Sequence, residues 1–136
     1  MMVQVNTCHN HEEAKQNEGR GRVEVIRGQE GCLLLKERGS WKQPCNQTIN
    51  FYNSYRWSFD NEHSVLSLEH LRYGQSNPTF LFHLVPSGDM ELTSRDLYAC
   101  ENDTYFGQLY YKANFLCFHW RTIGIHKNED IKYYYS

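Results

Sequence analysis

Apolar and polar residues follow one pattern up to about residue 18 and another from residue 20 to the end. Residues 1–18 are mostly polar and predict a loose arm or a short helix of one or two turns, ended by Gly19. From Arg20 onward, short apolar or alternating runs are separated by turn residues, which is typical of β-strands. We therefore predict nine strands, over residues 20–27, 32–38, 46–60, 64–72, 79–85, 90–101, 104–112, 114–123 and 130–136.

The predicted strand 46–60 shows the alternation most clearly. From Ile49 onward its odd-numbered residues are apolar, with Asn53 as the exception, and most even-numbered ones are polar. Successive side chains of a strand point to opposite faces, so this strand has one buried and one solvated face. The buried face carries Ile49, Phe51, Tyr55, Trp57 and Phe59.

The connections between the predicted strands are short turns, such as 86–89 and 112–114, and cannot hold the crossover that parallel strands need. Neighbouring strands therefore pair antiparallel. Because eight or nine such strands leave two open edges unless the sheet closes, we predict an all-β fold, an antiparallel up-and-down β-barrel or a strongly curved half-barrel. The closing strand would be 130–136. One face of that strand carries Ile131, Tyr133 and Tyr135, and the other carries Lys132 and Tyr134.

Length and composition fit one barrel domain. The chain has 136 residues, which we divide into an N-terminal arm or short helix, 1–18, and a barrel domain, 19–136. Aromatic residues make up 15 % of the chain, with ten Tyr and seven Phe, so we expect a core of large rings. The formal net charge of −2 provides no basic field for phosphates, and we expect no nucleic-acid partner.

Targeting, membrane and metal signals are weak. The first residues lack the apolar stretch of a signal peptide, and nowhere do eighteen apolar residues follow one another, so we expect no membrane segment. Five cysteines without CxxC spacing suit a reducing compartment, and the expected location is cytoplasmic. The segment "CHNH" at 8–11 lacks a fourth ligand at a structural zinc spacing, and no phosphate loop follows a strand. We predict no metal and no cofactor.

Several short motifs, in their order and spacing, carry a resemblance to a family. They are a glycine-rich first strand ("EGRGRVEV"), "LLLKERGSW", "YRW" at 55–57, "FH" at 82–83, "RDLY" at 95–98, and Trp120, Gly124 and Lys127 ahead of Tyr133 and Tyr135. From Gly19 to Ser136 the chain resembles a family of short proteins described as a domain of unknown function. The resemblance implies a lipocalin-like (calycin-like) barrel.

The chain departs from this family's pattern at two places. Glu91 and Thr93 stand where the family carries a His and a Cys, and Gly124-Ile125 stands where it carries Gly-Pro. A metal or thiol role at those positions would be lost here. Calycin-like chains also open with a Gly-x-Trp that plugs the barrel, which residues 1–18 lack. Either the arm plugs the barrel differently, or one end is open and covered by a second subunit.

Candidate site residues are the polar and aromatic side chains that such a barrel would turn inward, because ligand pockets are mostly apolar with a few placed donors. Each aromatic among them has an alternative role as a packing unit of the core. The candidates for ligand binding are Tyr55, Trp57, His83, Asp96, Tyr98, Trp120 and Arg121.

Three of these candidates have open alternatives. If Phe82 fills the core, His83 points to solvent, and if His83 points inward, it is the best polar group for a ligand. Asp96 belongs to a turn or ion pair with its neighbour Arg95, or to a catalytic site. Arg121 is a solvated outer-face residue, unless it meets a carboxylate or an anionic ligand inside.

Three functions follow from these residues. The first is a binding protein whose barrel holds a small apolar or aromatic molecule. The second is an interaction protein with a filled core, acting through a homodimer or protein partner by its exposed tyrosines. The third is an enzyme on a small hydrophobic substrate, which requires His83 and Asp96 to converge in the cavity. We assign no catalytic residue from the sequence.

Overall fold

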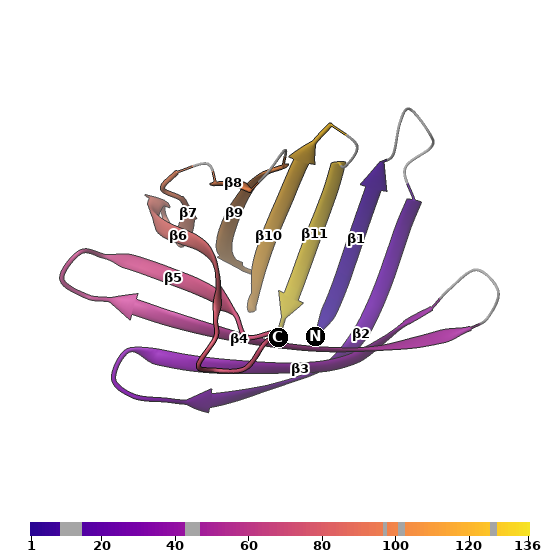
Figure 1. Ribbon diagram of the computed structural model, residues 1–136, viewed down its shortest axis with the longest axis horizontal. Helices are drawn as coiled ribbons and strands as arrows, with labels where there is room; N and C mark the ends of the chain where they lie inside the picture. Colours follow the sequence, from indigo (N-terminus) through magenta and orange to yellow (C-terminus); the bar gives the residue numbers. More distant parts are fainter. Residues whose placement is uncertain (9–14, 43–46, 97, 101–102, 126–127) are drawn as a thin grey trace.

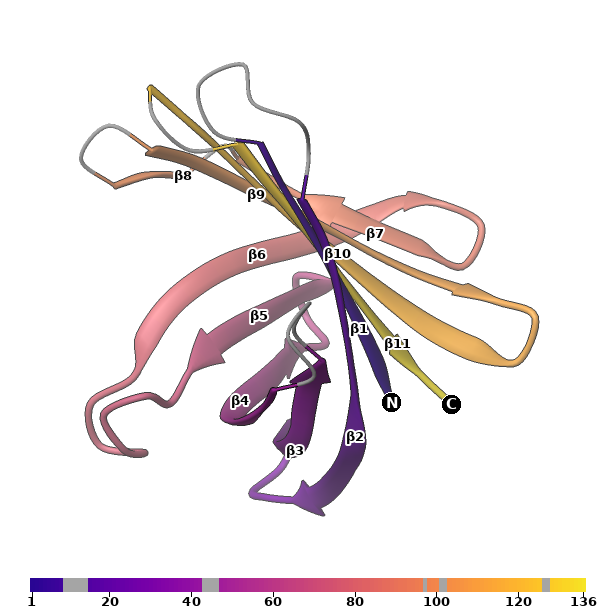
Figure 2. The same ribbon diagram turned by 90° about the vertical axis from the view of Figure 1, so that its right-hand side faces the viewer.

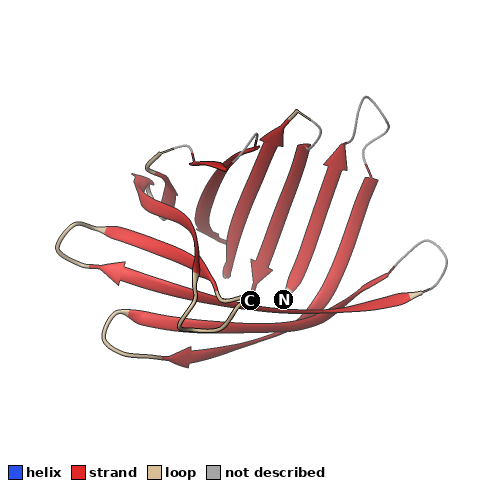
Figure 3. Cartoon of the chain, in the orientation of Figure 1, coloured by secondary structure: helices blue, strands red, loops and turns tan. Residues whose placement is uncertain are grey.

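The computed structural model describes residues 1–8, 15–42, 47–96, 98–100, 103–125 and 128–136. These residues contain strands and turns and no helix (Figure 3). No described segment is therefore a helix able to span a membrane. The strands are β1 Met2–Cys8, β2 Lys15–Arg27, β3 Cys32–Lys42, β4 Thr48–Asp60, β5 Val65–His70, β6 Thr79–Gly88, β7 Glu91–Ser94, β8 Tyr98–Cys100, β9 Asp103–Lys112, β10 Phe115–Gly124 and β11 Asn128–Tyr135.

Ten of these strands close into an antiparallel barrel. Strands β1 to β7 pair in sequence, β7 pairs with β9, and β9, β10 and β11 lead back to β1. Figures 1 and 2 show them wrapped around one interior, with both chain ends on the neighbouring strands β1 and β11. The remaining strand, β8, pairs with β9 beyond the stretch that pairs with β7. The predicted all-β antiparallel barrel is confirmed, with ten strands in place of eight or nine.

The predicted arm or short helix over 1–18 is wrong. Strand β1 (Met2–Cys8) pairs with both β2 and β11, and β2 begins at Lys15, before the expected start at residue 20. Residues 9–14 lie outside the described part. The prediction followed the polarity of the segment and overlooked that Val3 alternates with its polar neighbour Gln4. Val3 is only 1 % exposed, so its side chain anchors this strand in the core.

The C-terminal strand is part of the barrel wall, as predicted. It lies between β10 and β1 and is hydrogen-bonded to both. Tyr133 is buried against Phe118, with ring centroids 6.1 Å apart, and Tyr134 lies on the other face against Phe115. The barrel closes where β11 pairs with β1, a strand that the sequence analysis had not expected.

Large rings fill the interior. A barrel of eight strands is just wide enough for ordinary side chains, so ten strands need bulkier ones. Phe118 lies at the centre of the ring cluster, with Trp57, Phe82 and Tyr133 around it at centroid distances of 5.5, 6.0 and 6.1 Å. The cluster also contains Val3, Leu35, Tyr55, Leu68, Leu84 and Leu109. The expected aromatic core is thus present.

Gly39 of β3 marks a place where the wall has no room for a side chain. It pairs with Gly21 of β2 and with Phe51 of β4. A Cβ atom at Gly39 would lie 2.5 Å from the ring of Phe51 and still closer to the carbonyl oxygen of Arg20. Two backbones and one ring therefore approach each other here as only glycine allows.

Candidate functional site

An apolar cavity of about 340 Å³ lies at the part of the wall where one short strand replaces another. Strand β7 pairs with β6 between Leu84 and Gly88, whereas β8 pairs with β9 further along. The first half of β6 therefore borders the cavity. The lining residues are Thr79, Phe80, Leu81 and Phe82 of β6, Ala99 of β8, Tyr105 of β9 and Trp120 of β10.

Trp120 is one of the polar residues that line this cavity. Its ring meets Phe82 edge to face, with centroids 5.6 Å apart, and lies 6.4 Å from Tyr105. The indole nitrogen Nε1 is buried, and no described residue accepts a hydrogen bond from it. Buried donors are nearly always paired in proteins, because an unpaired one costs about 1–3 kcal/mol. Trp120 thus lines the cavity with its ring, while its indole nitrogen is shielded behind the wall and lacks an acceptor among the described residues.

A second polar feature lies deeper in the barrel, around Glu37 of β3. This carboxyl group is 0 % exposed, and the Tyr135 hydroxyl of β11 donates a short hydrogen bond to its Oε1. Burial raises the pKa of Glu37 to about 7, against the lowering effect of hydrogen bonds from Tyr135 and Asn53. Its other oxygen, Oε2, is buried and has no partner among the described residues.

Two more tyrosines extend the polar cluster around Glu37 across the interior. The hydroxyls of Tyr55 (β4) and Tyr133 (β11) are 3.2 Å apart, and the rings of Tyr133 and Tyr135 are stacked. Burial raises the pKa of Tyr133 to about 12 and that of Tyr55 well above its usual range, so both are neutral at physiological pH. The interior cluster of Glu37, Asn53, Tyr55, Tyr133 and Tyr135 therefore comes from three strands.

The sequence analysis named Tyr55 from this cluster but missed Glu37. A signal for Glu37 was present, because Leu33, Leu35 and Glu37 alternate along one strand and share its inner face. The partner Tyr135 follows 98 residues later in the chain, so the pair depends on the pairing of the whole barrel.

Three of the seven predicted site residues point into the barrel. Tyr55 and Trp57 are 5 % and 6 % exposed and belong to the core, while Trp120 lines the cavity. The indole nitrogen of Trp57 is also buried without a partner in the described part of the chain. For Tyr98 the structure describes the backbone position in β8 but not the side chain.

His83 lies on the outer face of β6. Its neighbours Phe82 and Leu84 are fully buried, and its Nδ1 lies 2.8 Å from the Oγ of Ser67 on β5. Partial burial lowers the pKa of His83, with a further contribution from Arg95. The alternative in which His83 points away from the core is therefore correct. Phe80 does not join Phe82 in the core, since the register of β5 and β6 shifts between Leu68 and Glu69.

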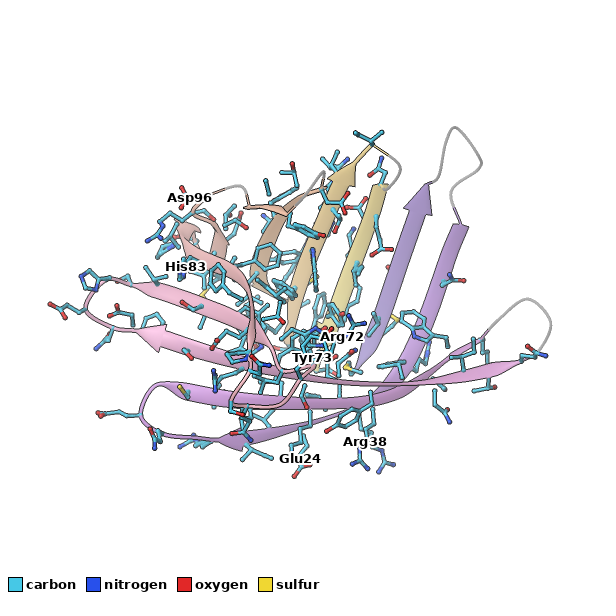
Figure 4. The ribbon with its side chains drawn as sticks, viewed as in Figure 1. Glu24, Arg38, Arg72, Tyr73, His83 and Asp96 are labelled. Carbon is cyan, nitrogen blue, oxygen red and sulfur yellow. The ribbon has the colours of Figure 1, made fainter. Side chains whose placement is uncertain are left out.

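Asp96 and Arg121 are also on the outside. Asp96 pairs with Arg95 at 3.2 Å, and both side chains are at least half exposed. Arg121 lies 3.8 Å from Asp130, which is bonded more closely to His119. Figure 4 shows His83 and Asp96 on the β6 side of the molecule, while Glu24 and Arg38 point away from the barrel below β3. Neither His83 nor Asp96 lines the cavity.

Comparison with known proteins gives a family but no activity. The model of a family of unknown function, DUF6314, matches residues 4–136. This agrees with the resemblance seen in the sequence and extends it to the N-terminal strand. No curated protein and no solved structure matches the chain.

Proposed function

The chain belongs to this family of unknown function, and from its own residues we propose that it is a binding protein for a small, uncharged, largely aromatic molecule. The observation that carries the proposal is the cavity of about 340 Å³, walled by Phe80, Phe82, Tyr105 and Trp120. Pockets for small molecules begin at about this volume and combine apolar walls with a few placed polar groups. On binding, the ring of Trp120 would turn its buried indole nitrogen toward the ligand's acceptor atom.

The lining favours binding over catalysis. Its polar groups are the hydroxyls of Thr79 and Tyr105 and the indole of Trp120. None of the described lining residues is a His, Asp, Glu, Lys or Cys, which are the side chains that most often act as general acids and bases. The described lining residues also include no charged side chain, so a charged ligand would lose its hydration there without compensation from them. The lipocalin-like kind of barrel, the cytoplasmic location and the homodimer remain predictions.

Calorimetric titration with 2-naphthol, an uncharged two-ring molecule with a hydroxyl acceptor, tests the proposal. We expect the wild type to bind it, and Trp120→Phe, which keeps an aromatic ring but removes the donor, to bind three- to tenfold more weakly. Trp57→Phe is the matched control, because Trp57 has a similarly buried indole nitrogen outside the cavity lining.

The second part of the test is a variant in which a new side chain fills the cavity. Ala99→Trp places a large ring at the β8 side of the lining and should abolish binding. Absence of naphthol binding to the wild type, or an equal loss in Trp57→Phe and Trp120→Phe, would contradict the proposed site. Native mass spectrometry of the purified protein then reports whether a natural ligand of this kind is retained.

A further inference from the structure

Glu37 is a buried acid that the proposed cavity does not use. It lies on the inner face of β3, is 0 % exposed and does not belong to the cavity lining. An ionised carboxylate in such a position needs a cation or several donors, because desolvation of a charge is expensive. Among the described residues Glu37 forms no ion pair, and one of its oxygens, Oε2, has no donor.

The groups that face Glu37 come from all the elements around it. Strand β4 contributes Asn53 and Tyr55, and β11 contributes Tyr133 and Tyr135. From β2 its cross-strand neighbour is the apolar Val23. The positive charge among its neighbours is the α-ammonium group of Met1, whose influence on the pKa of Glu37 is the smallest of the four causes. These surroundings favour the neutral acid.

The strands that cover Glu37, which are β2, β4 and β11, differ in how they are attached to β3. Strands β2 and β4 are hydrogen-bonded to β3 by its backbone, so they cannot leave Glu37 without breaking the sheet. Strand β11 is paired with β10 and β1 and reaches β3 across the interior through side chains. The part of the cover that can open without separating paired strands is therefore the side-chain contact of Tyr135, at the end of β11, with Glu37.

We propose that Glu37 and Tyr135 form a proton-dependent latch, in which the neutral acid keeps the end of β11 packed over β3 and loss of its proton opens this contact. Ionisation leaves a buried negative charge with one oxygen that no described residue donates to. Water reaches that oxygen when Tyr135 moves away. The raised pKa of Glu37, about 7, places the transition near neutral pH.

Hydrogen exchange measured by mass spectrometry between pH 5 and 9, corrected for the intrinsic pH dependence of exchange, tests the latch. We expect the peptide 128–136 to lose at least tenfold in protection as the pH rises through 7, while the peptide from the β4–β5 hairpin stays constant. Glu37→Gln keeps the shape of the side chain without a titrating proton, and its β11 protection should show no step.

Two further measurements keep the test decisive if the glutamine variant folds poorly. Tyr135→Phe removes a bond that lowers the pKa, so the step should move to higher pH. In the wild type, infrared difference spectroscopy should detect a buried protonated carboxyl that disappears with a midpoint near 7. A midpoint below 5, a pH-independent β11, or a step that persists in Glu37→Gln would each overturn the latch.

Discussion

Replacement of Gly39 by alanine tests the packing of the barrel wall at one defined point. A new Cβ would lie 2.5 Å from Cζ of Phe51 and closer still to the carbonyl oxygen of Arg20, whereas real Cβ contacts stay above 3.0 Å. The ring must therefore move by at least 0.5 Å, and the backbone of β2 by more. A ring can rotate away, but a carbonyl oxygen in a paired strand cannot.

The cost follows from these two displacements. Inserting one carbon into a packed site costs about 1–3 kcal/mol. Pushing β2 away from β3 also weakens the adjacent backbone hydrogen bonds, at about 1 kcal/mol each. We expect Gly39→Ala to lower the free energy of unfolding by about 3 kcal/mol. In a chain of this length that corresponds to a fall in Tm of roughly 10 °C.

Urea unfolding followed by tryptophan fluorescence measures this loss, and Gly28→Ala is its matched control. At Gly28 the nearest atom to a new Cβ is 3.5 Å away, an ordinary contact, and its φ angle is not in the left-handed range. The control should stay within about 0.5 kcal/mol of the wild type. Equal stabilities of the two variants would refute the close approach of β2 and β3 at this point.

Three further results are expected. Phe82→Ala should cost about 3–5 kcal/mol in urea unfolding, because Phe82 is fully buried, and a loss below 1 kcal/mol would contradict its place in the core. Glu37 holds a proton that the unfolded chain releases above its ordinary pKa of 4.5, so the contribution of Glu37 to stability is complete below pH 4.5 and falls by roughly 3 kcal/mol up to pH 7. Above pH 7 this dependence should level off, and in Glu37→Gln it should be absent. The Arg56–Glu69 pair is partly solvated, and a double-mutant cycle should give a coupling below about 1 kcal/mol.

Alternation along single strands could be predicted from the sequence, since it needs only the strand itself. The inward face of 46–60 was predicted correctly in the middle of the strand, where Tyr55 and Trp57 are buried, but wrongly near its ends, where Ile49 and Phe59 are exposed. In 130–136 the predicted inward Tyr133 is buried. The N-terminal strand was missed because its hydrogen bonds come from β2 and β11, and the segment's own composition shows little of this. A polar segment becomes a strand when both of its neighbours are already in place.

Register is the part of the site that the sequence could not provide. A shift in the pairing of β5 with β6 turns Phe80 out of the core, where it is 41 % exposed, although strict alternation groups it with Phe82. The bond between Glu37 and Tyr135 likewise depends on the position of β11 across the barrel from β3. Errors of one residue reverse a side chain's face, so outward residues such as His83 and Arg121 could not be separated from inward ones beforehand.

Two of the buried polar atoms that lack a partner in the described part of the chain are opposite in kind, and each carries one of the two proposals. At the cavity, Trp120 offers a donor without an acceptor, and at Glu37 an acceptor oxygen lacks a donor. The two cannot satisfy each other, because the rings of Phe82, Phe118 and Tyr133 form a continuous series of contacts between them. In the proposed function a ligand completes the first, once the ring of Trp120, which borders an apolar space of about 340 Å³, turns its nitrogen toward that space. The second is relieved by retaining a proton, and its state therefore follows pH.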